Sequence, residues 1–224
     1  MDNESDKGMK RLYIVVEGQT EEEFVKSVMA PYFQRFGIYS ITPVILHTSA
    51  AGKGGFVNYQ HLKNRITSLL KSMGDDVIVS MLVDFFRCPN LPNQEIWDKI
   101  GSHKERVAEM EHSISNDICD HRFIPYIQLH EFEALLFSSP VGFEAYFSDE
   151  EAKKAISVIN DFDNPEDINT SPTGAPSKRL SGIRQKYEKV VEGNVIAMEI
   201  GMDVIMSKCP RFRAWIEKLI ETCK

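Results

Sequence analysis

The sequence predicts an α/β fold in which a doubly wound, mainly parallel four-stranded sheet carries a C-terminal helical extension. Two observations favour it. Over residues 11–140, short apolar runs alternate with amphipathic stretches, as in parallel strands joined by helices. After Pro140 the strand-like runs stop and helical spacing continues. We therefore expect an α/β domain over residues 11–140 and a helical extension packed on it over residues 141–224.

The first half of the predicted domain contains two strands and two helices. RLYIVV, residues 11–16, is rich in β-branched and aromatic side chains and predicts a buried strand. Apolar residues then recur at helical spacing, which predicts a helix over residues 20–37 with Thr20 as its N-cap and Gly37 at its end. ITPVILHT is the second strand. The glycine-rich loop SAAGKGG precedes a helix with a basic face over residues 57–73.

Two further strands are expected. DVIVSMLVDFF is the most apolar run of the chain and suits a central parallel strand. RFIPYIQL is the fourth, and Pro125 places it near an edge because proline donates no ladder hydrogen bond. A helix is expected over residues 103–118, and HEFEALLF begins another. After a long polar loop, helices are expected over residues 178–189, 196–207 and 211–223.

Charge and composition exclude several classes of protein. A net charge of -7 argues against a surface coated with nucleic-acid-binding charge, although a local basic groove remains compatible with it. None of the four cysteines forms a C-x-x-C pair, so neither a zinc ribbon nor a redox motif is expected. The N-terminus is polar, and no run approaches the roughly 18 apolar residues of a membrane span. We expect a cytoplasmic protein without membrane partners, whose oligomeric state stays open.

Acidic side chains follow three of the predicted strands. Glu17 comes directly after the first strand, Asp84 ends the third, and the fourth runs into His130, Glu131 and Glu133. Because ligands gather outside the carboxyl ends of parallel strands, we expect these carboxylates to lie together. Their mutual repulsion would be relieved by a hard divalent cation, for which Mg²⁺ (or Mn²⁺) is the default.

Four side chains of this predicted site need separate interpretation. Glu21 lies in the first turn of the helix after the first strand, where it would either bind the cation or face the helix macrodipole. On a helix, Glu131 and Glu133 would point about 200° apart. Glu131 is therefore the expected nearer ligand, with Glu133 as a second candidate. His130 is a candidate general base, with a packed histidine as the alternative.

Three basic side chains are candidates for contacts with a substrate phosphate. Lys178 and Arg179 are expected close to a helix N-terminus beside the long loop, with Ser177 as the helix cap. Lys53 lies in AAGKGGF, which lacks the Walker A pattern, so a plain flexible loop is its alternative. A phosphate site built on EGQTEE without a metal is a weaker alternative to the cation site.

The stretches VEGQTEEEF and MLVDFF resemble two motifs of the Toprim domain, the metal-binding module of topoisomerases, bacterial primases and overcoming-lysogenization-defect (OLD) nucleases. Glu17, Gly18 and Glu21 match the first motif in its OLD-like form, and Asp84 matches the aspartate motif. The usual Asp-x-Asp is not kept, because two phenylalanines follow Asp84. PYIQLHEFEALLF, NPEDIN…TGAPSKRL and CPRFRAWIEKL resemble a family of small bacterial Toprim-like proteins of uncharacterised function.

This resemblance implies a Toprim-like fold and a Mg-dependent phosphodiester hydrolase, a nuclease acting on DNA or RNA in bacterial defence with an ATPase partner. Glu17, Glu21, Asp84 and Glu131 or Glu133 would hold one or two cations. No tyrosine nucleophile is identifiable, so hydrolysis is expected rather than a covalent step. Two alternatives stay open: a non-catalytic effector or sensor subunit that binds an ATPase, and an enzyme acting on small nucleotides.

Overall fold

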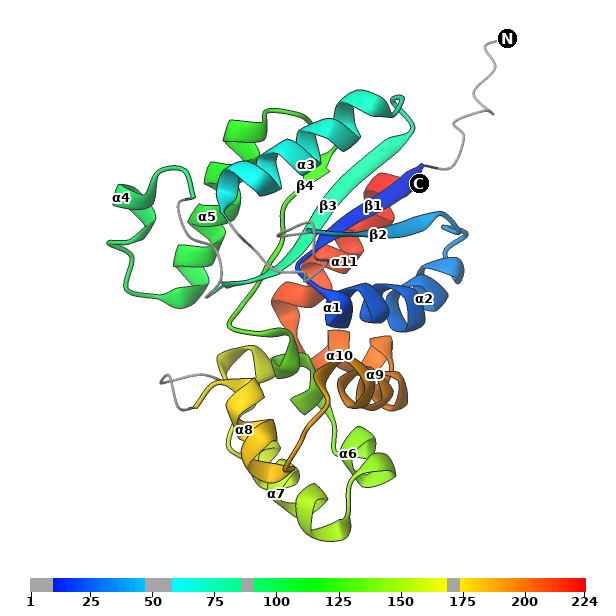
Figure 1. The fold of residues 1–224 in the computed structure, drawn as a ribbon, viewed down its shortest axis with the longest axis vertical. Helices are drawn as coiled ribbons and strands as arrows, with labels where there is room; N and C mark the ends of the chain where they lie inside the picture. The colour runs from blue at the N-terminus through cyan, green and yellow to red at the C-terminus, as the bar shows by residue number, and fades with distance from the viewer. Residues whose placement is uncertain (1–9, 47–57, 86–90, 169–173) are drawn as a thin grey trace.

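The computed structural model describes residues 10–46, 58–85, 91–168 and 174–224 (Figure 1). Its strands are β1 (Arg11–Val16), β2 (Ile41–Ile45), β3 (Val77–Asp84), β4 (Phe123–Ile124) and β5 (Ile127–Gln128). They are ordered β2-β1-β3-β4, with β5 also on β3, and every pairing is parallel. The predicted α/β class and mainly parallel sheet are therefore confirmed.

Pro125 divides the last strand into β4 and β5. The missing proline N–H interrupts the ladder, and the strand lies at the edge of the sheet, as predicted. Pairing with β3 resumes beyond the proline, where Val83 faces Ile127 and the last residue of β3 faces Gln128. The chain that follows β5 is thereby brought to the carboxyl end of β3.

Helical segments connect the strands and build the rest of the molecule. They are α1 (Gln19–Phe24), the π-helical η1 (Val25–Met29), α2 (Ala30–Gln34), α3 (Tyr59–Ser72), α4 (Gln94–Trp97), α5 (His103–Ile118), the 3₁₀ helix η3 (Phe132–Ser138), α6 (Val141–Tyr146), α7 (Asp149–Asn160), the 3₁₀ helix η4 (Pro165–Asp167), α8 (Pro176–Ile183), α9 (Lys189–Ile200), α10 (Met202–Lys208) and α11 (Pro210–Cys223). In the described part of the chain, no helix combines the length and apolarity that crossing a bilayer requires.

The helical segment after β1 departs from the prediction at its start. Helix α1 follows Gly18, two residues before the predicted cap Thr20, because the Glu21 carboxylate accepts a hydrogen bond from Gly18 N at 3.0 Å. A π-helical turn, η1, then precedes Pro31, whose nitrogen has no hydrogen to donate. The segment ends before Gly37, whose φ of 84° lies in the left-handed region that glycine adopts freely, as predicted.

Side chains of the sheet alternate between two hydrophobic layers, with helices on both faces (Figure 1). Leu12, Ile14 and Val16 of β1 pack in one layer with α1, η1, α2 and α11. Val15 and alternate residues of β3 pack in the other with α3 and α5. This is the doubly wound arrangement, and it explains why β3 is buried along its whole length.

The C-terminal helices share the hydrophobic layer of α1. Residues of α6, α7, α9, α10 and α11 all belong to it. Helix α11 lies against the sheet, where Trp215 Nε1 donates to Ser80 Oγ at 2.9 Å and the indole stacks on Tyr126 with ring centroids 4.3 Å apart. Helix α6 approaches α9 closely at Gly142, since a Cβ there would lie 2.6 Å from Ile196 O. The boundary at residue 140 stays a prediction.

The sequence predicted these helices less well than the sheet. Helices α6 and α7 were not predicted. The helix expected over residues 178–189 is divided, because α8 ends at Ile183 and α9 begins at Lys189. The one expected over 196–207 spans parts of α9 and α10, which meet at Gly201 with a φ of 77°. The last predicted helix corresponds to α11.

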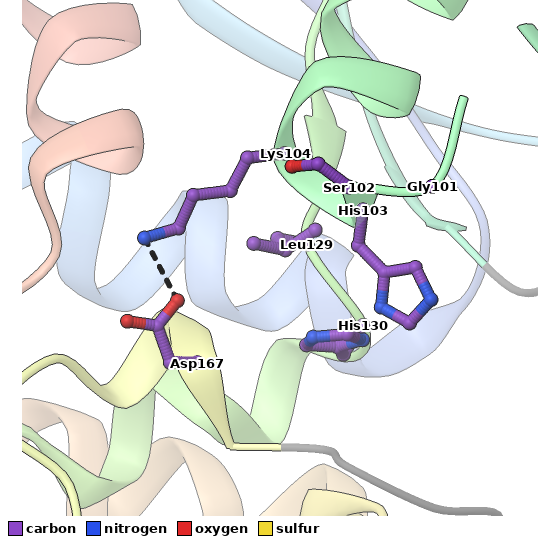
Figure 2. A pocket seen from close by; sticks show the side chains of 7 residues that line it. All are labelled: Gly101, Ser102, His103, Lys104, Leu129, His130 and Asp167. Carbon is purple, nitrogen blue, oxygen red and sulfur yellow. Dashed lines mark ion pairs between the residues drawn. The ribbon is translucent and has the colours of Figure 1, made fainter.

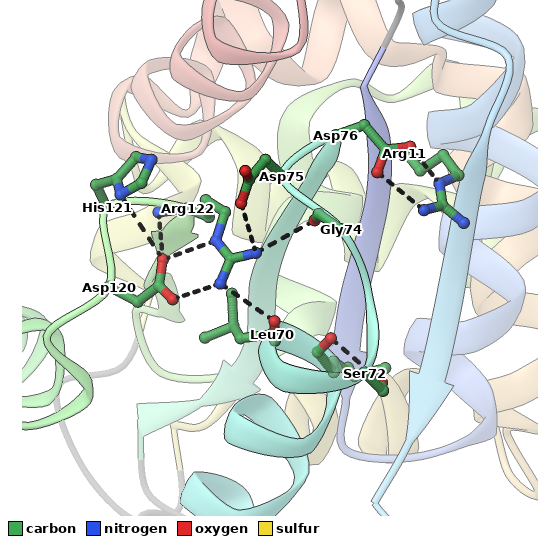
Figure 3. A network of polar contacts seen from close by, with 10 residues as sticks. Arg11, Leu70, Ser72, Gly74, Asp75, Asp76, Asp120, His121 and Arg122 are labelled. Carbon is green, nitrogen blue, oxygen red and sulfur yellow. Dashed lines mark hydrogen bonds and ion pairs between the residues drawn. The ribbon is translucent and has the colours of Figure 1, made fainter.

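Charged side chains at the amino end of the sheet occur in matched pairs (Figure 3). Arg11 donates to both carboxylate oxygens of Asp76, at 2.9 and 3.0 Å. Arg122 likewise forms a bidentate pair with Asp120 and also donates to carbonyl oxygens at the end of α3. At this edge each guanidinium is balanced by a neighbouring carboxylate, which contrasts with the carboxyl end.

Candidate functional site

The carboxyl ends of β1 and β3 place two predicted acids side by side. Glu17 directly follows β1, and Asp84 is the last residue of β3. The Asp84 backbone N donates to Glu17 Oε2 at 3.4 Å, and Phe132 N donates to Asp84 Oδ1 at 3.0 Å. Both carboxylates are buried. Strand β1 lies next to β3, so their ends bring residues distant in sequence to one edge, as expected.

Glu21 joins this edge from helix α1. Its Oε2 accepts the hydrogen bond from Gly18 N, and its Oε1 lies 3.9 Å from Lys189 Nζ. The next residue, Glu22, instead pairs with Lys26 along the helix at 2.6 Å. Adjacent glutamates of one helix therefore have different surroundings: Glu21 is buried in the cluster and Glu22 is not.

Glu133 completes an acidic cluster, which we define as Glu17, Glu21, Asp84 and Glu133. Its side chain in η3 is 0% exposed, and its Oε1 lies 3.2 Å from Lys189 Nζ. This is an ion pair whose geometry falls short of a hydrogen bond: within the described chain, neither Glu133 oxygen accepts one. A buried carboxylate that is held by one ion pair has oxygen lone pairs available to a further partner such as a water molecule or an ion.

Lys189 is the site residue that the sequence did not single out. It is the first residue of α9, where a positive charge opposes the helix macrodipole, and this was the one available signal. Asn194 fixes α9 against α1, because its Nδ2 donates to Thr20 O at 3.2 Å. The ammonium is thereby held within 4 Å of Glu21 and Glu133.

Burial and charge shift the proton affinities of the cluster. Burial is the main cause that raises the pKa of Asp84 well above its ordinary value. Lys189 opposes that shift, while Glu21, Glu17 and Glu133 add to it. Burial likewise raises the pKa of Glu133 against the influence of Lys189. Burial alone would lower the pKa of Lys189, but the surrounding carboxylates outweigh it and raise that pKa, so the ammonium stays charged.

Glu131, the predicted nearer ligand, contacts a different element. Its backbone is extended, as expected at the end of the strand. Its Oε2 accepts a hydrogen bond from Ser177 N at 2.9 Å, which satisfies a free N–H in the first turn of α8. The predicted cap Ser177 is therefore inside the helix, and the Glu131 side chain takes the capping role. Whether Glu131 also binds a cation stays a prediction.

His130 occupies the turn between β5 and η3 with a φ of 70°, which is rare for a residue with a Cβ. The ring is buried against His103 and Phe85, with centroids 5.2 and 6.4 Å away. Burial, and then the charge of His103, lower the pKa of His130 to about 4. The imidazole is therefore neutral at pH 7. Figure 2 shows it beside His103 in a surface pocket.

Two of the three predicted phosphate-binding side chains lie on α8. Lys178 is exposed on α8. Arg179 donates from Nε to Gly174 O at 2.8 Å, and its guanidinium lies 5.3 Å from the centroid of the Phe162 ring. Lys53 lies outside the described residues. The phosphate contacts of all three stay predictions.

The acidic cluster fits a hard divalent cation by the chemistry of its donors, since carboxylate oxygens are the ligands that Mg²⁺ prefers. The buried Glu133 oxygens without hydrogen bonds support that fit. In the arrangement described, however, no group of three or more His, Cys, Asp or Glu side chains already surrounds one point as a metal shell. Binding would therefore require small side-chain movements, in particular of Lys189.

Comparisons with known proteins place this chain in a family. The model of a family described as "Domain of unknown function (DUF4276)" matches residues 16–220. No curated protein matches the chain. Three solved structures of the C-terminal region of the OLD protein of Xanthomonas campestris pv. campestris were found, phased with iodine, mercury and platinum.

These structures are distant from this chain. The iodine-phased one is 17% identical with a TM-score of 0.42, and covers 96% of this chain and 97% of its own. The mercury-phased one is 15% identical with a TM-score of 0.37, and the match covers 95% of this chain and 98% of the solved one. Likeness at this level carries no argument about activity, so functional inference depends on the site itself.

Proposed function

We propose that this chain, which belongs to the DUF4276 family, is a Mg²⁺- or Mn²⁺-dependent phosphodiester hydrolase that cleaves DNA or RNA. The observation that carries the proposal is the acidic cluster, which gathers carboxylates from four separate segments: the end of β1, helix α1, the end of β3 and η3. All four side chains are buried. Burial of like charges is costly, so their retention at the ligand-binding edge of the sheet favours a functional role.

The residues of the site have separable roles in this proposal. Glu17, Glu21, Asp84 and Glu133 would hold the cation, which would supply Lewis-acid activation of the phosphate and of water. Lys189, whose pKa is raised, stays charged and faces the negative charge of the phosphate.

Three further side chains would act on the substrate. His130 is neutral at pH 7 because its pKa is lowered to about 4, so it is able to accept a proton but is a weak base. Arg179 is held in place by Gly174 O and the Phe162 ring. Together with the exposed Lys178, it would contact the phosphates of the nucleic acid from the side of α8.

The test compares two adjacent glutamates of α1. Purified wild type is incubated with single- and double-stranded DNA and with RNA, in Mg²⁺, in Mn²⁺ and in chelator. Cleavage should require the metal, and Glu21→Gln should reduce it by about 10²-fold or more. Glu22→Gln, which changes a side chain paired with Lys26 outside the cluster, is the matched control and should retain wild-type activity.

Equal activity of both variants, or cleavage that persists in chelator, would overturn the proposal. Crystals soaked in Mn²⁺ provide a second readout that does not depend on turnover: an anomalous peak is expected within coordination distance of both Glu17 and Asp84. A peak elsewhere would assign the cation to another site.

A non-catalytic effector or sensor subunit that binds an ATPase is the second candidate. It is favoured by Lys189, because an ammonium already within 4 Å of Glu21 and Glu133 is able to compensate buried charge without a metal. This candidate predicts that Glu21→Gln leaves partner binding intact and that wild type does not cleave DNA or RNA even with the partner added.

A further inference from the structure

A surface pocket opens between the start of α5 and the turn after β5 (Figure 2). Its volume is about 320 Å³, at the small end of the range for ligand pockets. Ser102, which caps α5, and His103 and Lys104 of α5 line one side, and Leu129, His130 and Asp167 line the other. The recess is large enough for one flat heterocycle and too small for a longer segment of polynucleotide.

Two histidine rings line this pocket, and the ring of Phe85 packs against both of them. His103 and His130 are 5.2 Å apart between centroids, and Phe85 lies 5.5 Å from His103 and 6.4 Å from His130. The His103 side chain is exposed, so part of its ring is accessible from solvent. Such platforms bind bases of single strands by stacking, an interaction that tolerates any base because every base has a π-face.

The charges of the pocket favour a neutral group over a phosphate. Lys104, its cationic side chain, is already paired with Asp167 at 2.8 Å, across the mouth seen in Figure 2. An anion would have to compete with that carboxylate. The pair and the Ser102 hydroxyl instead offer both donors and acceptors, which suits the edge of a base.

The covalent connections of the chain place the pocket next to the acids. Phe85 directly follows Asp84 at the end of β3, and His130 directly precedes Glu131. The left-handed backbone of His130 turns the chain at this point, so that the imidazole faces the pocket while Glu133 reaches the acidic cluster. A strand whose scissile phosphate lies at the acids would therefore carry a neighbouring base past the pocket.

We propose that the pocket formed by His103, His130 and Leu129 binds one unstacked nucleobase next to the scissile phosphate. The proposal rests on the proposed function for the identity of the ligand. It assigns the protein a single-stranded or locally unpaired nucleic acid as substrate, because a base within a duplex cannot reach the platform.

The experiment measures equilibrium binding in chelator, where no cleavage occurs. Two fluorescent single strands of equal length are used, one of ordinary DNA and one with abasic sugars at every position. His103→Ala should weaken binding of ordinary DNA by about tenfold and leave binding of the abasic strand unchanged. His103→Phe keeps a ring and should retain most of the affinity. His112→Ala, which removes an exposed histidine further along α5, is the matched control.

Each other outcome overturns the base pocket. Wild-type affinity for ordinary DNA in His103→Ala would show that the ring is not a platform, and an equal loss on both strands would indicate a backbone contact instead. Absence of measurable single-strand binding by wild type would also exclude it. Cleavage is measured separately from binding. If the protein binds single strands as predicted but never cleaves them, the hydrolase proposal is refuted and the base pocket stands.

Discussion

Replacement of Lys189 by methionine tests whether its ammonium and a divalent cation compensate the same charge. The change keeps the length of the side chain and removes the cation that lies 3.2 Å from Glu133 Oε1 and 3.9 Å from Glu21 Oε1. At an effective dielectric constant of about 20, Coulomb's law gives roughly 5 kcal/mol for the shorter pair. Lys189 is 33% exposed and desolvation offsets part of this energy, so we expect a net loss of about 2 kcal/mol.

The assay is thermal unfolding in chelator and in Mg²⁺. For a chain of this size, about 2 kcal/mol corresponds to a decrease in Tm of roughly 4–8 °C. A cation at about 100 times its Kd contributes about 2.7 kcal/mol to the folded state, which would offset the loss. Mg²⁺ should therefore raise the Tm of Lys189→Met by several degrees more than that of wild type. Lys153→Met, on the exposed face of α7, should change the Tm little in either condition.

Two results would refute this reasoning. If Lys189→Met is as stable as wild type in chelator, the ammonium does not compensate the buried carboxylates. If it is destabilised but Mg²⁺ shifts both proteins equally, the divalent cation binds away from Glu21 and Glu133. The second result would also count against the acidic cluster as the catalytic centre.

Three further predictions follow from other contacts. The pKa of Asp84 is higher in the folded protein than in the unfolded chain, so its contribution to stability is full at low pH and is lost as the pH rises through the folded value. In urea melts without metal, the free energy of unfolding of Asp84→Asn relative to that of wild type should therefore be about 1 kcal/mol higher at pH 8 than at pH 5. The variant should also lose cleavage. A difference between the two proteins that does not change with pH would contradict the raised pKa. Glu131→Ala should destabilise the protein by about 1 kcal/mol through the lost α8 cap but retain metal-dependent cleavage, whereas lost cleavage in a folded variant would make Glu131 a ligand. Gly142→Ala should cost about 1–3 kcal/mol because its Cβ would lie 2.6 Å from Ile196 O, while Gly182→Ala on α8 meets nothing within 4 Å and should be neutral or stabilising in the same melts.

The sheet was predictable because its signal is local. β1 and β3 are short apolar runs, and the acids that end them can be assigned to the carboxyl edge before any tertiary contact is known. Predicting that Glu17 and Asp84 lie together needed only the assumption that their strands are neighbours. The pairing of β1 with β3 satisfies it. The position of Pro125 predicted the edge for the same reason, since the loss of one N–H acts on the ladder directly.

The relation between Glu131 and Glu133 was not predictable from spacing. It depends on the left-handed backbone of His130 and on a 3₁₀ rather than an α-helical start to η3. Neither has a signature in HEFEALLF, because histidine only occasionally adopts a positive φ and tertiary packing decides the helix type. Helix α7 did have a signal: its N-cap Ser148 and the third residue of the helix, Glu151, form a capping box.

Lys189 shows why the site as a whole could not be predicted from its strands. Its side chain reaches Glu21 because α9 packs on α1, where Asn194 donates to Thr20 O, and it pairs with Glu133 because η3 carries that residue to the same place. The acids come from residues before 140 and their ammonium from a helix after it. The contacts of Lys189 and the hydrophobic layer that α6, α9 and α11 share with β1 both cross the predicted boundary at residue 140. The helical part is therefore a component of the site as well as of the core, and the acidic cluster is built by the whole fold.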